Sequence, residues 1–133
     1  MDIQWVIIAN SFSVGTNGQM DIKGISNEVR AKKPGYRATF IVLAKVTNED
    51  QDIGTEIELT LQIQRKGKES VASLSQLYKA GGLGEQAKST PFVYFDIKGL
   101  PFRKTGSYSF DISIDGEFKG REWLTISNIG DEK

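Results

Sequence analysis

The sequence has 133 residues, enough for one domain that buries a substantial core without a disulfide or a metal to hold it together. It contains no cysteine and no histidine, which excludes disulfides, thiolate zinc sites and catalytic triads that use a histidine base. Lysine plus arginine and aspartate plus glutamate each number 17, so the formal net charge is zero. This balance argues against nucleic acid as a partner, because phosphate contacts usually need a basic excess.

The N-terminus, MDIQWVIIANSF, has an acidic residue at position 2 and an apolar run too short for the core of a secretion signal. No stretch approaches the ~20 apolar residues that a membrane-spanning helix needs. We therefore expect a cytoplasmic protein without a membrane anchor.

Strand patterns dominate the first half of the chain. Residues 2–9 and 20–26 are short apolar candidates. Residues 36–46 are apolar almost throughout, which is typical of a central strand covered on both faces or of a strand whose outer face meets a partner. Residues 55–65 alternate strictly between apolar and polar side chains, which predicts a strand with one face in the core and one in water.

The second half continues in the same way. Residues 73–80, SLSQLYKA, fit either a short helix or the continuation of a strand. About seven or eight short strands separated by turn residues predict an all-β, immunoglobulin-like sandwich of two antiparallel sheets. We expect one domain over residues 1–129 and a polar tail over 130–133. Four more segments have the composition of strands: 68–74, 91–97, 107–114 and 121–126.

The clearest local pattern is GLPFRKTGSYSFDISIDGE, residues 99–117. Its strand alternates apolar and polar residues after a turn at Gly106, and Asp115-Gly116 has the composition of a two-residue hairpin turn. The layout looks like the tyrosine corner of immunoglobulin-like sandwiches, in which a buried Tyr108 bonds its hydroxyl to the loop at 100–106. Structural roles are therefore expected for Gly106, Tyr108, Phe110, Asp115 and Gly116.

Two further features of this region need an interpretation. Asp111, Asp115 and Glu117 could form a carboxylate cluster, but a turn aspartate and a solvated strand face account for them without a function. A strict two-residue turn would leave Leu124 and Ile126 outside the core. We therefore predict a bulge near Gly120, which would turn those two side chains inward.

Three motifs carry a resemblance that spans almost the whole chain: the N-terminal IQWVIIANSFSV followed by Gly18 and IKGI, the apolar FIVLAKV, and the ending GLPFRKTGSYSFDISIDGE with LTI after it. In these motifs the chain resembles a family of small bacterial proteins classed only as a domain of unknown function. The resemblance implies a β-sandwich of bacterial or phage origin and no catalytic residue. Residues 78–90 depart from it, being rich in glycine and lysine where the family is more often rich in proline and acids.

Residues 78–90, YKAGGLGEQAKST, form the longest stretch with little regular pattern, and such loops are often functional. Their glycines could offer backbone N–H groups to an anion, although no nucleotide-binding GKS or GKT follows. Candidate binding residues are Tyr78, Lys79, Gly82, Leu83, Gln86 and Lys88.

Other polar clusters have simpler explanations. The acidic run at 48–52 lacks the spacing of a calcium loop, and we expect neither a metal nor a cofactor. Two basic clusters, around the turn at 34–35 and at 65–68, fit solvated strand ends.

The first strand has two apolar faces, with Trp5 and Ile7 on one and Val6 and Ile8 on the other. It also lacks lysine and proline, the usual protection of a strand at a sheet edge. We therefore predict a homodimer whose interface includes Trp5, Val6 or Ile8.

Together these patterns favour a non-catalytic binding or scaffolding module for a protein partner. A small-ligand site for a nucleotide or carbohydrate in the 78–90 loop, with Tyr36, Tyr78 and Tyr94 nearby, is the first alternative. A carboxylate-based enzyme is the second.

Overall fold

The fold was analysed in a computed structural model, which describes residues 2–14, 20–25, 27–31, 36–47, 54–68, 70–79, 92–102 and 104–128. Over these residues the chain is all-β and contains no helix. The strands are β1 (Asp2–Ala9), β2 (Ser11–Val14), β3 (Met20–Lys23), β4 (Glu28–Ala31), β5 (Tyr36–Thr47), β6 (Glu56–Arg65), β7 (Ser70–Lys79), β8 (Phe92–Phe102), β9 (Gly106–Ile114) and β10 (Glu117–Asn128).

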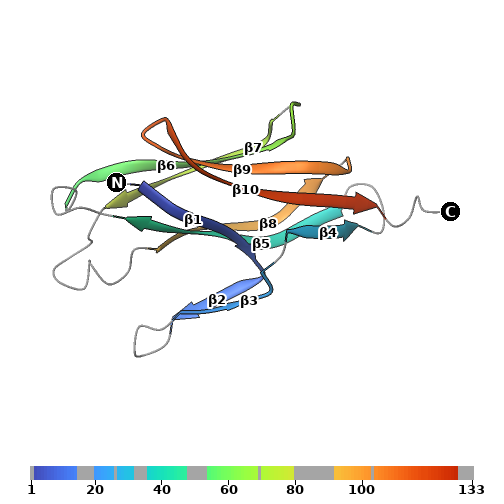
Figure 1. The fold of residues 1–133 in the computed structure, drawn as a ribbon, viewed down its shortest axis with the longest axis horizontal. Coiled ribbons are helices and arrows are strands. Elements are labelled where there is room, and N and C mark those ends of the chain that lie inside the picture. The colour runs from blue at the N-terminus through green and yellow to red at the C-terminus, as the bar shows by residue number, and fades with distance from the viewer. Residues whose placement is uncertain are drawn as a thin grey trace.

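The strands form two packed layers and a small appendage, as Figure 1 shows. One layer is a three-stranded sheet in the order β1-β5-β8, and the other is a five-stranded sheet in the order β4-β10-β9-β6-β7. The hairpin β2-β3 lies on the far side of the three-stranded sheet. The predicted β-sandwich is therefore confirmed, and the ambiguous segment 73–80 belongs largely to strand β7.

Two details of the prediction were wrong. The described residues contain ten strands, more than the seven or eight expected, because β2 and β4 have four residues each and are too short to show a periodic pattern. The sandwich is also not wholly antiparallel, since β4 pairs with β10 in parallel register.

The core lies between the two sheets and is built by alternation. In β6 every second side chain is buried, which confirms the pattern predicted for residues 55–65. β5 is covered on both faces, also as predicted: Phe40 and Val42 face the core, while Ile41 and Leu43 face the hairpin β2-β3. Because Phe12 and Ile22 of that hairpin pack against Ile41 and Leu43, the outer face of β5 is covered from within the chain.

β1 is an edge strand, as predicted, but its two faces are used differently from the prediction. Val6 and Ile8 are 7% and 3% exposed because they point into the core between the sheets. Trp5 points the other way and its ring centroid lies 5.8 Å from that of Phe92. Val6 and Ile8 are thus inaccessible to a partner, and both apolar faces of β1 are packed against other parts of the same chain.

The C-terminal hairpin has the turn and the bulge that the sequence predicts. Asp115 and Gly116 have φ values of 49° and 84°, and Ile114 pairs with Glu117 across a two-residue turn. The β9–β10 register then shifts between Phe118 and Gly120. As a result Leu124, like Ile126 after it, is buried in the core.

Tyr108 has both features of the predicted corner. Its ring is buried against Phe102, with 4.9 Å between ring centroids, and its hydroxyl donates a hydrogen bond to the carbonyl of Lys104. We expect Tyr108→Phe to lower the free energy of unfolding by about 1 kcal/mol, because the substitution removes this hydrogen bond and little packing. Urea denaturation of both proteins measures the difference, and an unchanged midpoint would show that the hydroxyl contributes nothing.

Candidate functional site

The candidate site is the outer face of the five-stranded sheet, formed by strands β10, β9, β6 and β7. Alternation decides which side chains reach it, because the intervening residues of each strand point into the core. The polar set from β9, β6 and β7 is dominated by hydroxyl and amide groups. Across the middle of the face the register aligns Phe118, Ser113, Thr60 and Ser75 in one row, Arg121, Asp111, Gln62 and Ser73 in the next, and Trp123, Ser109, Gln64 and Ser70 in the third.

The centre of this face on β10 is a cation held between two aromatic rings. The Arg121 guanidinium carbon lies 5.1 Å from the Phe118 ring centroid and 5.4 Å from the Trp123 ring centroid. Both rings remain exposed to solvent, Phe118 by 52% and Trp123 by 38%. Phe118 reaches the same face as Trp123 because the bulge between Phe118 and Gly120 shifts the register of β10.

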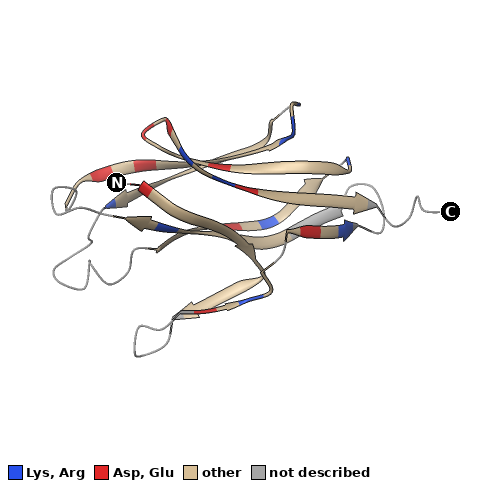
Figure 2. Ribbon diagram, in the orientation of Figure 1, with Lys and Arg blue, Asp and Glu red and all other residues tan. Residues whose placement is uncertain are grey.

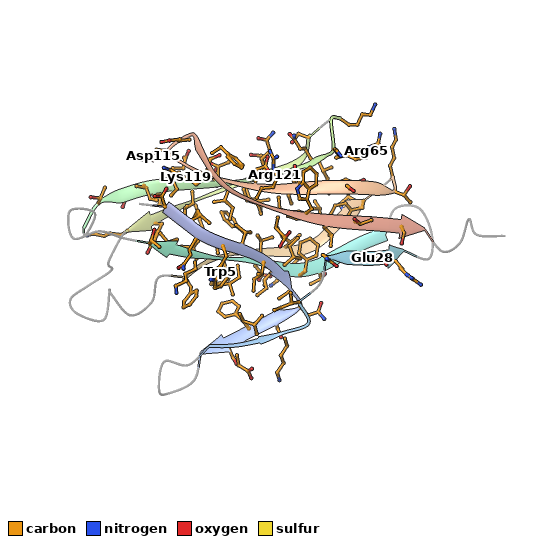
Figure 3. The ribbon with its side chains drawn as sticks, in the orientation of Figure 1. Trp5, Glu28, Arg65, Asp115, Lys119 and Arg121 are labelled. Atoms are coloured by element: carbon orange, nitrogen blue, oxygen red, sulfur yellow. The ribbon has the colours of Figure 1, made fainter. Side chains whose placement is uncertain are left out.

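Asp111 of β9 fixes the position of Arg121. Its two carboxylate oxygens accept hydrogen bonds from Arg121 Nε at 2.7 Å and Arg121 Nη2 at 3.0 Å. This bidentate arrangement holds the guanidinium plane and leaves its faces to the aromatic rings. Figure 3 labels Arg121 in the sheet that contains β10. The hydrogen bond that Arg121 donates to Asp111 raises the pKa of Arg121, although desolvation acts in the opposite direction.

The rest of the face can form hydrogen bonds but carries little net charge. Arg121 and Asp111 neutralise each other at its centre. The Thr60 and Ser75 hydroxyls share a hydrogen bond of 3.1 Å, and Ser109 is covered between its register neighbours Trp123 and Gln64. The face therefore combines exposed aromatic surface with neutral polar groups that can form hydrogen bonds.

The residues predicted for a ligand site are not gathered by the described part of the fold. Tyr78 is half-buried and packs against the core from β7, whereas Lys79 is exposed opposite Glu56 at the end of that strand. Tyr94 is exposed on the opposite sheet, where it contacts Phe12. Four more of the predicted binding residues lie outside the described residues: Gly82, Leu83, Gln86 and Lys88. The acidic run 48–52 and the turn at 34–35 also lie outside them.

The three carboxylates near the C-terminal hairpin have separate structural partners. Asp111 binds Arg121, while the Asp115 carboxylate accepts a hydrogen bond of 2.9 Å from the backbone N–H of Glu58. Glu117 is exposed and lies 3.7 Å from Lys119 Nζ. Within the stretches of chain that the structure describes, no group of three or more Asp, Glu, His or Cys side chains could hold a metal ion.

Sequence reasoning missed the three residues at the centre of this face, Phe118, Arg121 and Trp123. A usable signal was present, because the predicted bulge places residue 118 on the same face as residues 121 and 123. Two aromatic residues flanking an arginine on the outer side of a strand are a recognisable interface pattern.

The fold and this face together define a two-layer β-sandwich with an aromatic and hydroxyl-rich outer sheet. The chain belongs to the family described as "Family of unknown function (DUF6941)", whose model matches residues 4–127. A search of curated proteins found no match. In the part of the chain described here, no helix has the length and hydropathy to cross a membrane.

Proposed function

We propose that the protein is a non-catalytic binding module that recognises another protein through the outer face of its five-stranded sheet. The observation that carries the proposal is the arrangement of Phe118, Arg121 and Trp123 around one fixed guanidinium group. Tryptophan and arginine are enriched among the residues that dominate the energy of protein–protein interfaces.

Preorganisation supports the same function. Arg121 is held by Asp111 before any partner binds, so little side-chain entropy is lost when a partner covers it. The aromatic rings on either side remain open to solvent and would lose exposed apolar surface on binding. The sequence supports a non-catalytic module because it lacks histidine and cysteine, the residues that most often act as general base or nucleophile.

Three further properties belong to this proposal. The hydrogen-bonded Tyr108 supports an immunoglobulin-like sandwich, and the resemblance of the N-terminal and C-terminal motifs supports a bacterial or phage origin. A cytoplasmic location is in keeping with a sequence that contains no cysteine and so needs no disulfide-forming environment.

Substitution of both exposed rings tests the function. We expect Phe118→Ala with Trp123→Ala to abolish retention of partner proteins by the immobilised chain, because the pair removes the apolar contact area at the centre of the face. Affinity capture from the source cells, followed by mass spectrometry, measures which proteins are retained. Tyr94→Ala is the matched control, since Tyr94 is an exposed ring on the opposite sheet. Equal retention by the double variant and the wild type would exclude this face.

A carbohydrate is the second candidate, favoured by the hydroxyl and amide groups that lie beside Trp123. Sugar rings stack on exposed aromatic side chains and offer hydroxyls to groups such as Gln64 and Ser70. A ligand that binds the folded chain raises its melting temperature, so a screen of neutral oligosaccharides distinguishes this candidate from a protein partner.

A further inference from the structure

The charges of the described chain are distributed unevenly along the strands of the five-stranded sheet. Glu56 and Glu58 lie at one end of β6, and the turn at its other end carries Lys66 and Lys68. Figure 2 shows red segments mainly at one end of the upper sheet and blue segments at the β6–β7 turn at the other end. Lys79 lies opposite Glu56 at the first end, but Glu58 there has an apolar neighbour, Leu77, so the outer face is more acidic at this end and basic at the β6–β7 turn.

From this arrangement we propose that the protein recognised by the outer face is a second copy of the same chain, stacked with its strands antiparallel to the first. The inference rests on the proposed function, because it uses the same face. A two-fold axis that lies in the interface and crosses the strands at the row of Gln62 and Asp111 reverses the strand direction. Each acidic end then meets the partner's basic end.

The register makes this pairing specific. Glu58 and Lys66 lie equally far along the chain from Gln62, so the axis places Glu58 of one copy opposite Lys66 of the other, twice in the dimer. A two-fold axis parallel to the strands would instead bring the acidic ends together, and like charges in contact oppose association. Charge complementarity thus selects the antiparallel arrangement.

The aromatic side chains follow the same symmetry. The rows of Phe118 and Trp123 lie on either side of the row of Asp111, because these residues pair with Ser113 and Ser109 of β9. The axis therefore places Phe118 of one copy over Trp123 of the other, and the reverse. Such mutual contacts characterise an isologous interface, in which the same patch serves both subunits.

The size and exposure of the face are adequate for a dimer. The four strands that form it have 9 to 12 residues each, comparable to the extent of a standard interface of ~800 Å² per partner. Three of the five large apolar side chains that stand exposed in the described chain lie on this face: Leu77, Phe118 and Trp123. A partner that covers this face therefore covers three of these five side chains at once.

Charge reversal with complementation tests the inference. Sedimentation velocity of the wild type should give a dimer at micromolar concentration, and Glu58→Lys or Lys66→Glu should each weaken it roughly tenfold, because attraction becomes repulsion at two symmetric contacts. Mixing the two variants should restore the dimer, since the lysine introduced in one variant then meets the glutamate introduced in the other. Asp21→Lys and Lys23→Glu, on exposed positions of the hairpin, are the matched controls and should leave the dimer unchanged.

A disulfide provides the second measurement. The chain has no cysteine, so Gln62→Cys introduces a single thiol next to the axis, and mild oxidation should link two copies, whereas Asp21→Cys should not form the linked dimer. A monomer in sedimentation, or a dimer that is insensitive to both charge reversals, would overturn the inference. The protein could prove to be a monomer that still retains other proteins in the affinity capture. If Phe118→Ala with Trp123→Ala then abolishes this retention, the proposed function stands and only the identity of the partner changes.

Discussion

Replacing Phe110 by alanine is expected to lower the free energy of unfolding by about 3–5 kcal/mol, the cost of removing a large buried aromatic side chain. Phe110 is 0% exposed and lies in the middle of β9, where it pairs with Ile63 of β6. Its ring centroid lies 5.6 Å from that of Phe40 in the opposite sheet, in an edge-to-face arrangement. The side chain therefore connects the two layers, and its loss leaves a cavity that the surrounding strands cannot easily close.

Equilibrium urea denaturation measures this effect, with Ser113→Ala on the outer face of the same strand as the control. The control should change stability by no more than about 0.5 kcal/mol, because a half-buried serine on the polar side of the sheet contributes little packing. A loss below about 1 kcal/mol for Phe110→Ala would mean that the two sheets are not held together by this ring.

The strands that the sequence predicts well are those with one face in the core and one in water. In β6 the period-two alternation matches the burial of the side chains, because a residue on the wrong face would expose an apolar group or bury a polar one. In β9 it does so with the exception of Ser109, an outward serine that is 1% exposed. The same logic locates the bulge of β10, since only a shift before residue 124 turns Leu124 inward.

Other parts of the fold have no local signature. The parallel pairing of β4 with β10 brings together Val29 and Ile126, which are separated by most of the sequence. The four residues of β4 show no periodicity from which this pairing could be predicted. The burial of Val6 and Ile8 between the two sheets was not predicted, for a related reason. An apolar strand face looks the same in the sequence whether the opposite sheet or another molecule covers it.

The candidate site was missed because composition drew attention to loops. Tryptophan is usually a core residue. The outward position of Trp123 follows only once the bulge is shown to turn the neighbouring Leu124 inward, because adjacent residues of a strand point to opposite faces. The contact of Arg121 with Asp111 depends on the exact cross-strand register, which a one-residue change in the hairpin would abolish. Register, rather than residue type, thus determines which side chains the outer face of the sandwich presents.

The bulge that exposes Phe118 also brings β10 against the edge of β1. A Cβ atom at Gly120 would lie 2.9 Å from Ile3 Cγ2 and 3.2 Å from Val6 Cγ2, so the position has no room for a side chain. Asp2 binds Lys119 at the same contact, at 3.2 Å, and this hydrogen bond raises the pKa of Lys119. The packing of the Ile3 and Val6 side chains against position 120 therefore favours glycine there.

We accordingly expect Gly120→Ala to destabilise the protein by about 1–3 kcal/mol through overpacking. Ile3→Ala should also destabilise the protein. The double variant should lose about 1 kcal/mol less free energy of unfolding than the sum of the two single variants, because the space left by Ile3 accepts the new methyl group. Gly116→Ala is the control. Its φ of 84° makes it costly, yet no atom lies within 4 Å of its added Cβ, so its effect should simply add to that of Ile3→Ala. Urea denaturation of the six proteins completes both cycles, and additivity in the Gly120 cycle would show that β1 and β10 do not meet at this glycine.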